Sequence, residues 1–125
     1  MRLKALWTRE AVERGTDRIA GVKLRQLTSA ALVSHNIYCE ERYASTDGRF
    51  LAFYRSPNGL SPYELWVCDL ETSSSAFVSA GVDGLPTSTI FSDRLYFPVR
   101  RGESGRALMR LDFKTFELDQ VVDLS

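Results

Sequence analysis

The sequence contains one histidine, His35, and two cysteines, Cys39 and Cys68, among its 125 residues. A metal centre built from imidazoles needs several histidines that converge on one point, and His35 alone cannot form one. Two distant cysteines are also too few for a structural zinc site or for a disulfide framework. We therefore expect no metal site or cofactor in this chain, and we expect both cysteines to behave as small buried apolar residues.

An excess of charge of either sign is absent as well. Sixteen basic and sixteen acidic residues cancel, and no run of like charge stands out, whereas a nucleic-acid binder carries a basic stripe. No segment approaches the roughly 18 apolar residues of a membrane span, and residues 1–7 are too short and too charged for a signal peptide. These absences predict a cytoplasmic chain that binds neither nucleic acid nor membrane.

Familiar catalytic motifs are missing too. The run at residues 102–105 has two glycines but lacks the lysine and the following helix of a phosphate-binding loop. No serine stands in a recognisable nucleophile elbow. The sequence thus offers no catalytic residue by motif.

What the sequence does contain is a strand pattern that occurs twice, about 43 residues apart. Leu51 and Phe53 recur as Leu95 and Phe97 with an offset of 44, and from Leu65 onward the offset is 43. The slip of one residue lies in a turn rich in Gly, Ser and Pro, where insertions are tolerated. A repeat of about 40–50 residues with several short strands is typical of a β-propeller blade.

Each copy divides into four candidate strands in which apolar residues alternate, so that one face of each strand points inward. Turn signals rich in Gly, Pro, Asn and Asp separate the strands. The predicted strands are 38–44, 49–55, 63–70 and 75–79 in the first copy and 87–91, 94–100, 106–113 and 118–123 in the second. The fold class predicted is all-β.

The predicted organisation is two four-stranded β-propeller blades plus an N-terminal extra strand. Residues 1–30 form a lead-in, residues 31–81 the first blade and residues 82–125 a second, degenerate blade. Within the lead-in, residues 8–15 could form one or two capped helical turns or an irregular segment, and residues 21–28 read as a strand.

Two blades cannot close a ring, because propellers typically have about 4–8 blades. Stacked repeats also need about three units or more to be stable, since each unit exposes a face that only a neighbour can cover. The chain is therefore expected to be part of a larger propeller, or to assemble with copies of itself into a ring or an open stack.

Three segments carry a resemblance to a known family. The run from Ser45 to Phe53 resembles the Ser-Pro-Asp-Gly signature of TolB-like propeller repeats, with Thr46 in place of proline. Residues 64–70 resemble the strand that follows it, and residues 23–28 resemble the end of such a blade. Together they look most like the amino-terminal blades of oligogalacturonate-lyase-like propellers. The second copy is degenerate, because Ser92-Asp93 stands where the signature would be.

The resemblance implies two alternative functions. Lyases of this family cleave pectin oligosaccharides by β-elimination with a divalent metal such as manganese, held largely by histidines. With one histidine, this chain reads best as a non-catalytic binding or scaffold module. The alternative is the amino-terminal part of a carbohydrate-active, metal-dependent lyase whose active residues lie in other blades or protomers, with an acidic oligosaccharide as ligand.

Polar residues near the expected channel are the candidate ligand groups. His35 and Asn36 precede the first full blade and either line the channel mouth or hydrogen-bond a loop. Arg55 and Arg100 occupy corresponding positions in the two copies, as do Arg49 and Arg94, and such arginines could bind a carboxylated sugar. The candidate ligand-binding residues are His35, Asn36, Tyr38, Arg42, Arg55 and Arg100. Trp66 could stack on a sugar, although packing between blades explains it more simply.

Overall fold

The computed structural model describes residues 1–37, 42–83 and 88–124. This part of the chain contains eleven β-strands and no helix, which confirms the all-β prediction. The strands are β1 (Thr8–Arg9), β2 (Val12–Thr16), β3 (Lys23–Gln26), β4 (Val33–Asn36), β5 (Phe50–Ser56), β6 (Tyr63–Asp69), β7 (Ser74–Val82), β8 (Thr89–Phe91), β9 (Arg94–Arg101), β10 (Gly105–Asp112) and β11 (Leu118–Asp123). None of the described segments is a helix of the length and apolar character that a membrane crossing requires.

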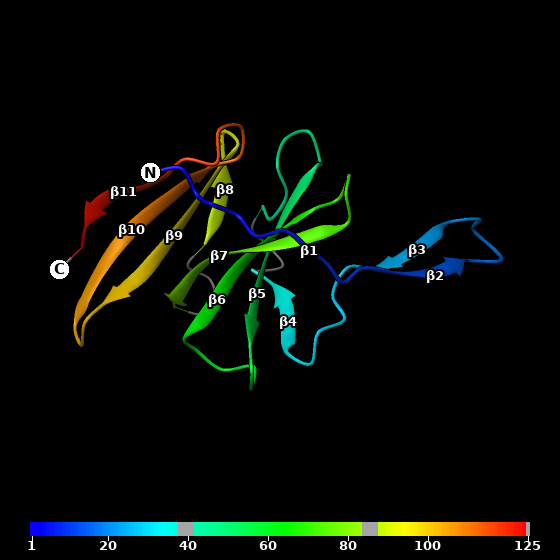
Figure 1. Cartoon of the computed structure of the whole chain (residues 1–125), viewed down its shortest axis with the longest axis horizontal. Helices are drawn as coiled ribbons and strands as arrows, with labels where there is room; N and C mark the ends of the chain where they lie inside the picture. Colours follow the sequence, from blue (N-terminus) through cyan, green and yellow to red (C-terminus); the bar gives the residue numbers. More distant parts are fainter. Residues whose placement is uncertain (38–41, 84–87, 125) are drawn as a thin grey trace.

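Two antiparallel blades dominate the structure (Figure 1). In the first blade β4, β5, β6 and β7 pair in chain order, and in the second β8, β9, β10 and β11 do the same. The two blades meet where Val82 of β7 pairs with Val99 of β9. The prediction of a partial propeller is confirmed.

The hydrophobic core lies between the two blades. Alternation along β5 directs Phe50, Ala52 and Tyr54 into it. Strand β9 contributes Leu95, Phe97 and Val99 in the same way. The Tyr54 hydroxyl donates to Ser88 Oγ at 2.6 Å, which links the first blade to the segment before β8. The core residues are Ile37, Phe50, Ala52, Tyr54, Leu65, Val67, Val78, Val82, Ile90, Leu95, Phe97, Val99, Ala107, Leu111 and Phe113.

Residues 1–11 form a segment, here called the strap, that crosses both blades (Figure 1). The backbone N–H of Leu118 donates to the Met1 carbonyl at 2.9 Å, at the start of β11. Further along, β1 pairs with the first residues of β7. Between these points Trp7 packs edge-on against Phe116. The strap therefore joins the outer strands of the two blades.

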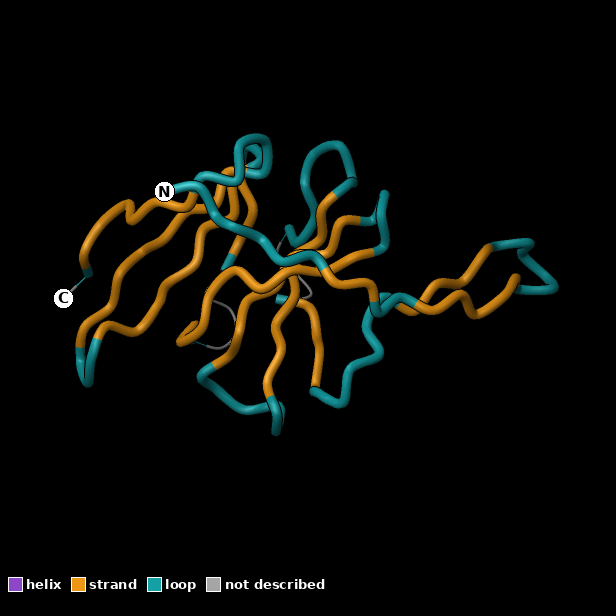
Figure 2. The backbone as a smooth tube through the Cα atoms, viewed as in Figure 1, coloured by secondary structure: helices purple, strands orange, loops and turns teal. Residues whose placement is uncertain are grey.

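The strap leads into a hairpin, residues 12–26, in which β2 pairs with β3 and with no strand of a blade. Every residue of the two strands is exposed. Figure 2 shows this hairpin projecting beyond the first blade. The helical alternative for residues 8–15 is wrong, because Thr8, Arg9 and residues 12–16 pair as strands instead. The strand expected at 21–28 exists as β3, but it does not close a blade.

The inner strand of the first blade also differs from the prediction. The structure places it at β4, which includes the two residues expected to lie in a loop, His35 and Asn36. The predicted strand 38–44 falls partly on 38–41, outside the described residues, and its last residue, Ala44, makes one isolated bridge to Leu51. Sequence periodicity missed β4 because a four-residue strand with mostly polar side chains carries little alternating signal.

Candidate functional site

The first blade has a back face, which points away from the second blade. Because Ala52 and Tyr54 of β5 face the core, the alternate residues Leu51, Phe53 and Arg55 lie on this back face. Cross-strand pairing places Trp66 of β6 opposite Phe53. The back face is therefore an aromatic surface with one arginine, and it is the face that a neighbouring blade would cover in a complete propeller.

Arg55 is almost completely buried on this face, with 2% of its surface exposed. Its guanidinium forms an ion pair with Glu10 of the strap and donates through Nε to Ser34 Oγ at 3.1 Å. The guanidinium carbon also lies 4.5 Å from the ring centroid of Trp66, in a cation–π contact. A buried arginine needs such a complete set of partners, because an unpaired charge away from water is costly.

Glu10 is held in place by the chain that returns from the hairpin. The backbone N–H of Ser29 donates to Glu10 Oε1 at 3.2 Å, and the Ser29 hydroxyl donates to the Glu10 carbonyl at 2.7 Å. Sequence reasoning missed Glu10, because its partner lies 45 residues away and nothing local marks the pair. The strap and residues 27–29 thus cover part of the back face.

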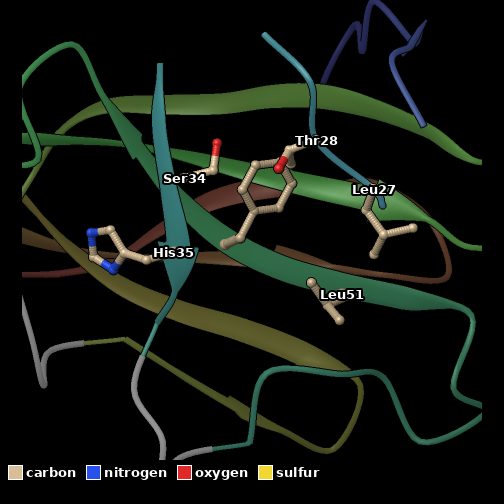
Figure 3. Close-up of a pocket in the computed structure, with 6 residues that line it drawn as sticks. Leu27, Thr28, Ser34, His35 and Leu51 are labelled. Carbon is tan, nitrogen blue, oxygen red and sulfur yellow. The ribbon is translucent and has the colours of Figure 1, made fainter. Parts of the chain in front are cut away.

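The part that stays uncovered forms a pocket of about 250 Å³. Figure 3 shows the side chains of Leu27, Thr28 and Leu51 on one side of β4. The lining is largely apolar, and its residues are Leu27, Thr28, Ser34, His35, Leu51 and Phe53. The pocket lies beside the guanidinium of Arg55, but that group already binds Glu10 and Ser34.

The ring of His35 points to the other side of β4 (Figure 3). It packs edge-on against Tyr54 and Tyr63, with ring centroids 5.6 and 5.0 Å away. Its Nδ1 donates to the Asn36 carbonyl at 3.0 Å. In this position the imidazole serves as a packed aromatic side chain with a local hydrogen bond.

Two other candidates near the inner strands lie at the surface. Asn36 and Arg42 are exposed, and the Arg42 carbonyl accepts a hydrogen bond from the Ile90 N–H at 3.2 Å. Tyr38 lies outside the described residues. These residues stay predictions as ligand groups.

Arg100 does not occupy the position equivalent to Arg55. Successive propeller blades are related by a rotation, so the face of the second blade that points toward the first blade matches the back face of the first blade. Val99 lies on the former face and Arg55 on the latter. The offset of 44 thus continues to the end of the strand, and Arg55 corresponds to Val99. Arg100 binds Asp83 at 2.6 Å, and so does Arg106. Burial raises the pKa of Asp83, but hydrogen bonds from these two arginines outweigh burial and lower it overall.

The other two arginines, Arg49 and Arg94, form similar ion pairs in the two blades. They stand one position apart in the repeat, since Asp69 is paired with Phe50 and Asp112 with Arg94 itself. Arg49 binds Asp69 at 2.9 Å, and Arg94 binds Asp112 at 3.3 Å. In each blade the pair links the start of the second strand to the end of the third. These arginines therefore hold each blade together, and both are committed to carboxylates of the chain itself.

The described residues hold no group of three or more His, Cys, Asp or Glu side chains that could bind a metal ion. Cys68 is a buried free thiol, as expected, and burial raises its pKa above the usual value. Cys39 lies outside the described residues. Trp66 is half-buried on the back face and not between the two blades of this chain, so its packing against a neighbouring blade stays a prediction.

Comparison with solved structures identifies the architecture. The chain superposes on an oligogalacturonate lyase from Vibrio parahaemolyticus with a TM-score of 0.66 at 19% identity, covering 98% of this chain and 32% of that one. It superposes on an oligogalacturonate lyase in complex with manganese with a TM-score of 0.62 at 22% identity, covering 99% and 32%. No family model and no curated protein matches the sequence.

The resemblance to oligogalacturonate-lyase-like propellers is thereby confirmed at the level of the fold. The chain spans about a third of the length of the solved propellers that it matches. By its fold it therefore resembles part of a larger propeller.

Proposed function

We propose that this chain is a non-catalytic propeller segment that acts as a binding or scaffold module, packing its blades against further blades of a longer chain or of other copies. The observation that carries this proposal is the use of its candidate ligand groups. Arg55 is bound to Glu10, Arg100 to Asp83, and His35 is packed between two tyrosine rings. Because these side chains already contact other residues of the chain, they stabilise the fold and are not available to a ligand.

The surface that remains for packing is the free face of the second blade, formed by alternate residues of β9, β10 and β11. Because Leu95, Phe97 and Leu111 face the core, Tyr96 and Leu108 face the other way and are only half-buried. The same alternation places Arg100, Arg106 and Arg110 on this face. There they pair with Asp83 and Asp119. The face therefore combines half-buried apolar side chains with ion pairs, a composition suited to contact with another blade.

A manganese-dependent lyase, of which this chain would form one part, is the second candidate. It is favoured by the similarity to the lyase solved in complex with manganese. The described residues do not fit such a centre, because His35 stands alone among them as an imidazole and its Nδ1 already donates to a carbonyl. We assign no step of that reaction to this chain.

An assay on an unsaturated digalacturonate, with and without manganese, tests whether this chain has lyase activity of its own. Product formation is followed by the absorbance of the new double bond. We expect no turnover by the wild-type chain or by its His35→Ala variant. Turnover that His35→Ala abolishes would overturn the non-catalytic proposal.

Packing through the free face is tested by light scattering of the wild type and of Leu108→Glu. The substitution replaces a half-buried apolar side chain of this face with a charged one, so we expect it to reduce the solution mass. Glu103→Lys, in the exposed turn between β9 and β10, is the matched control and leaves the mass unchanged. Equal masses for Leu108→Glu and the wild type would exclude this face as the contact.

A further inference from the structure

Two strand pairs at opposite ends of the molecule offer complementary surfaces. Figure 1 shows the hairpin (residues 12–26) at one end and β11 at the other. The hairpin is a two-stranded sheet that pairs with no strand of a blade, and Arg25 of β3 donates a hydrogen bond to Ser73 Oγ in the turn before β7. An isolated two-stranded hairpin is only marginally stable in water, so this one is suited to binding a further surface.

The hairpin is basic and carries exposed apolar residues. Four basic side chains stand against two acidic ones, and the basic residues are Arg14, Arg18, Lys23 and Arg25. The exposed apolar residues include Ile19 at the tip, Val22 and Leu24, with 99%, 53% and 48% of their surfaces exposed. The combination would add both charge and apolar area to a contact.

The end of the chain has the opposite charge. Residues 117–124 include three acidic side chains and no basic one. They also expose apolar surface, with Val121 45%, Val122 44% and Leu124 54% exposed. Strand β11 is the last strand of the nine-stranded sheet and pairs with β10 on one side only.

The outer edge of β11 already accepts a strand at its first residue. Met1 of the strap exchanges hydrogen bonds with Leu118, donating at 3.1 Å and accepting at 2.9 Å. Beyond Leu118 this edge continues through residues 119–123, with a shift of register against β10 at Val121. An edge strand of this kind is a template for another strand.

We propose that the hairpin of one copy of this chain binds the outer edge of β11 in a second copy, by β-strand addition. This inference names the partner and the contact for the self-association in the proposed function, on which it rests. Main-chain hydrogen bonds supply the attachment, Arg18 and Lys23 face the acidic segment 117–124, and the exposed valines and leucines of both segments lose contact with water.

The contact joins two different surfaces, so each copy offers one hairpin and one β11 edge to its neighbours. Two β11 edges disfavour pairing with each other, because both are acidic. A contact of this head-to-tail type closes a ring if the rotation between copies allows it.

Mixing two variants tests the proposal. The hairpin variant, Arg18→Glu/Lys23→Glu, reverses the net charge of the hairpin, and the edge variant, Val122→Lys/Asp123→Lys, neutralises the acidic segment 117–124. We expect each variant alone to associate about tenfold more weakly than the wild type in sedimentation equilibrium. Mixed in equal amounts, they should form a heterodimer, because one intact hairpin and one intact edge remain. Thermal melting of each variant verifies that the blades are folded.

Three results would overturn the proposal: a wild type that stays monomeric at every concentration, variants that associate as strongly as the wild type, or a mixture that fails to form heterodimers. If the hairpin and edge variants keep the wild-type mass while Leu108→Glu loses it, the hairpin contact fails and the packing of blade faces stands. Lyase turnover dependent on His35 would instead remove the proposed function itself. Association through the hairpin should also weaken at high salt, which screens the opposite charges.

Discussion

The back face of the first blade and the free face of the second blade differ in what covers them. On the back face Phe53 and Arg55 are 5% and 2% exposed, because Glu10 and residues 27–29 pack over them. On the free face Leu108 is half-buried. A blade face in this fold thus becomes part of the interior only when a second element covers it, and here that element is a short strap and a return segment.

We expect a large loss of stability when the ion pair that holds the strap on the back face is removed. Arg55→Ala removes a buried side chain and leaves the partly buried Glu10 without its ion-pair partner, so we expect it to lower the free energy of unfolding by about 3 kcal/mol in urea titrations. The double substitution Arg55→Met/Glu10→Leu removes both charges and should recover most of the loss.

An equal loss in the single and the double variant would show that the packing of the arginine side chain matters more than its charge. The exposed Arg18→Ala, in the hairpin turn, is the control and should change stability little.

The next prediction compares the two faces of β10 through the same substitution, leucine to alanine, on each face. Leu111 is fully buried between the blades, whereas Leu108 lies on the free face. We expect Leu111→Ala to cost about 2–5 kcal/mol, from lost burial and the cavity left behind. Leu108→Ala should cost less than about 1.5 kcal/mol in the same urea titrations. Similar costs for both would mean that the free face is covered in solution.

A smaller effect compares the similar ion pairs of the two blades. Burial raises the pKa of Asp69, but hydrogen bonds from Arg49 and from the Glu71 N–H outweigh burial and hold the pKa below its usual value of 3.8. Asp69 is 7% exposed and Asp112 is 22% exposed, so we expect Asp69→Asn to cost about 1–2 kcal/mol and Asp112→Asn less.

The same pairs predict a pH dependence. Because the pKa of Asp69 is lower in the folded than in the unfolded state, its contribution is complete above about pH 4, the unfolded value. It is lost as the pH falls through the folded-state pKa. Urea titrations from pH 7 down to pH 3 should show a steeper loss for the wild type than for Asp69→Asn, and parallel curves would contradict the pair's role.

The smallest expected effect concerns the degenerate turn of the second blade. Ser92 and Asp93 both have positive φ, at 50° and 57°, whereas the first blade places Gly48 at its turn. Asparagine adopts this conformation several times more often than most residues, so Ser92→Asn should raise the free energy of unfolding by about 0.5 kcal/mol. Asp93 is not a suitable site, since its Oδ1 accepts from the Thr46 N–H at 2.7 Å. Unchanged stability in thermal melts would show that serine adopts this positive φ without strain.

The strands that alternate apolar and polar residues could be predicted from the sequence. β5, β6, β9 and β10 lie close to their predicted ranges, because burial of one face imposes a period of two on the residues. The turn at Gly48 was predictable for a similar local reason, since its positive φ of 73° suits glycine. β4 and the hairpin were missed or misassigned, because their mostly exposed residues carry no such period.

The candidate site was less predictable than the fold. Arg55 was singled out from its repeat position, but its partner Glu10 and its neighbour Ser34 are 45 and 21 residues away in the chain. The equivalence of Arg55 with Arg100 followed from spacing and is wrong, since strand alternation places Val99 at the matching position.

The sequence by itself determined that this protein is a pair of β-propeller blades, because period, turn residues and repeat length are local properties that strands and turns impose directly. Only the tertiary structure decided what covers each blade face and which charges meet. Those contacts join distant segments, and the free energy of burying Arg55 depends on whether Glu10 reaches it, which no local pattern records.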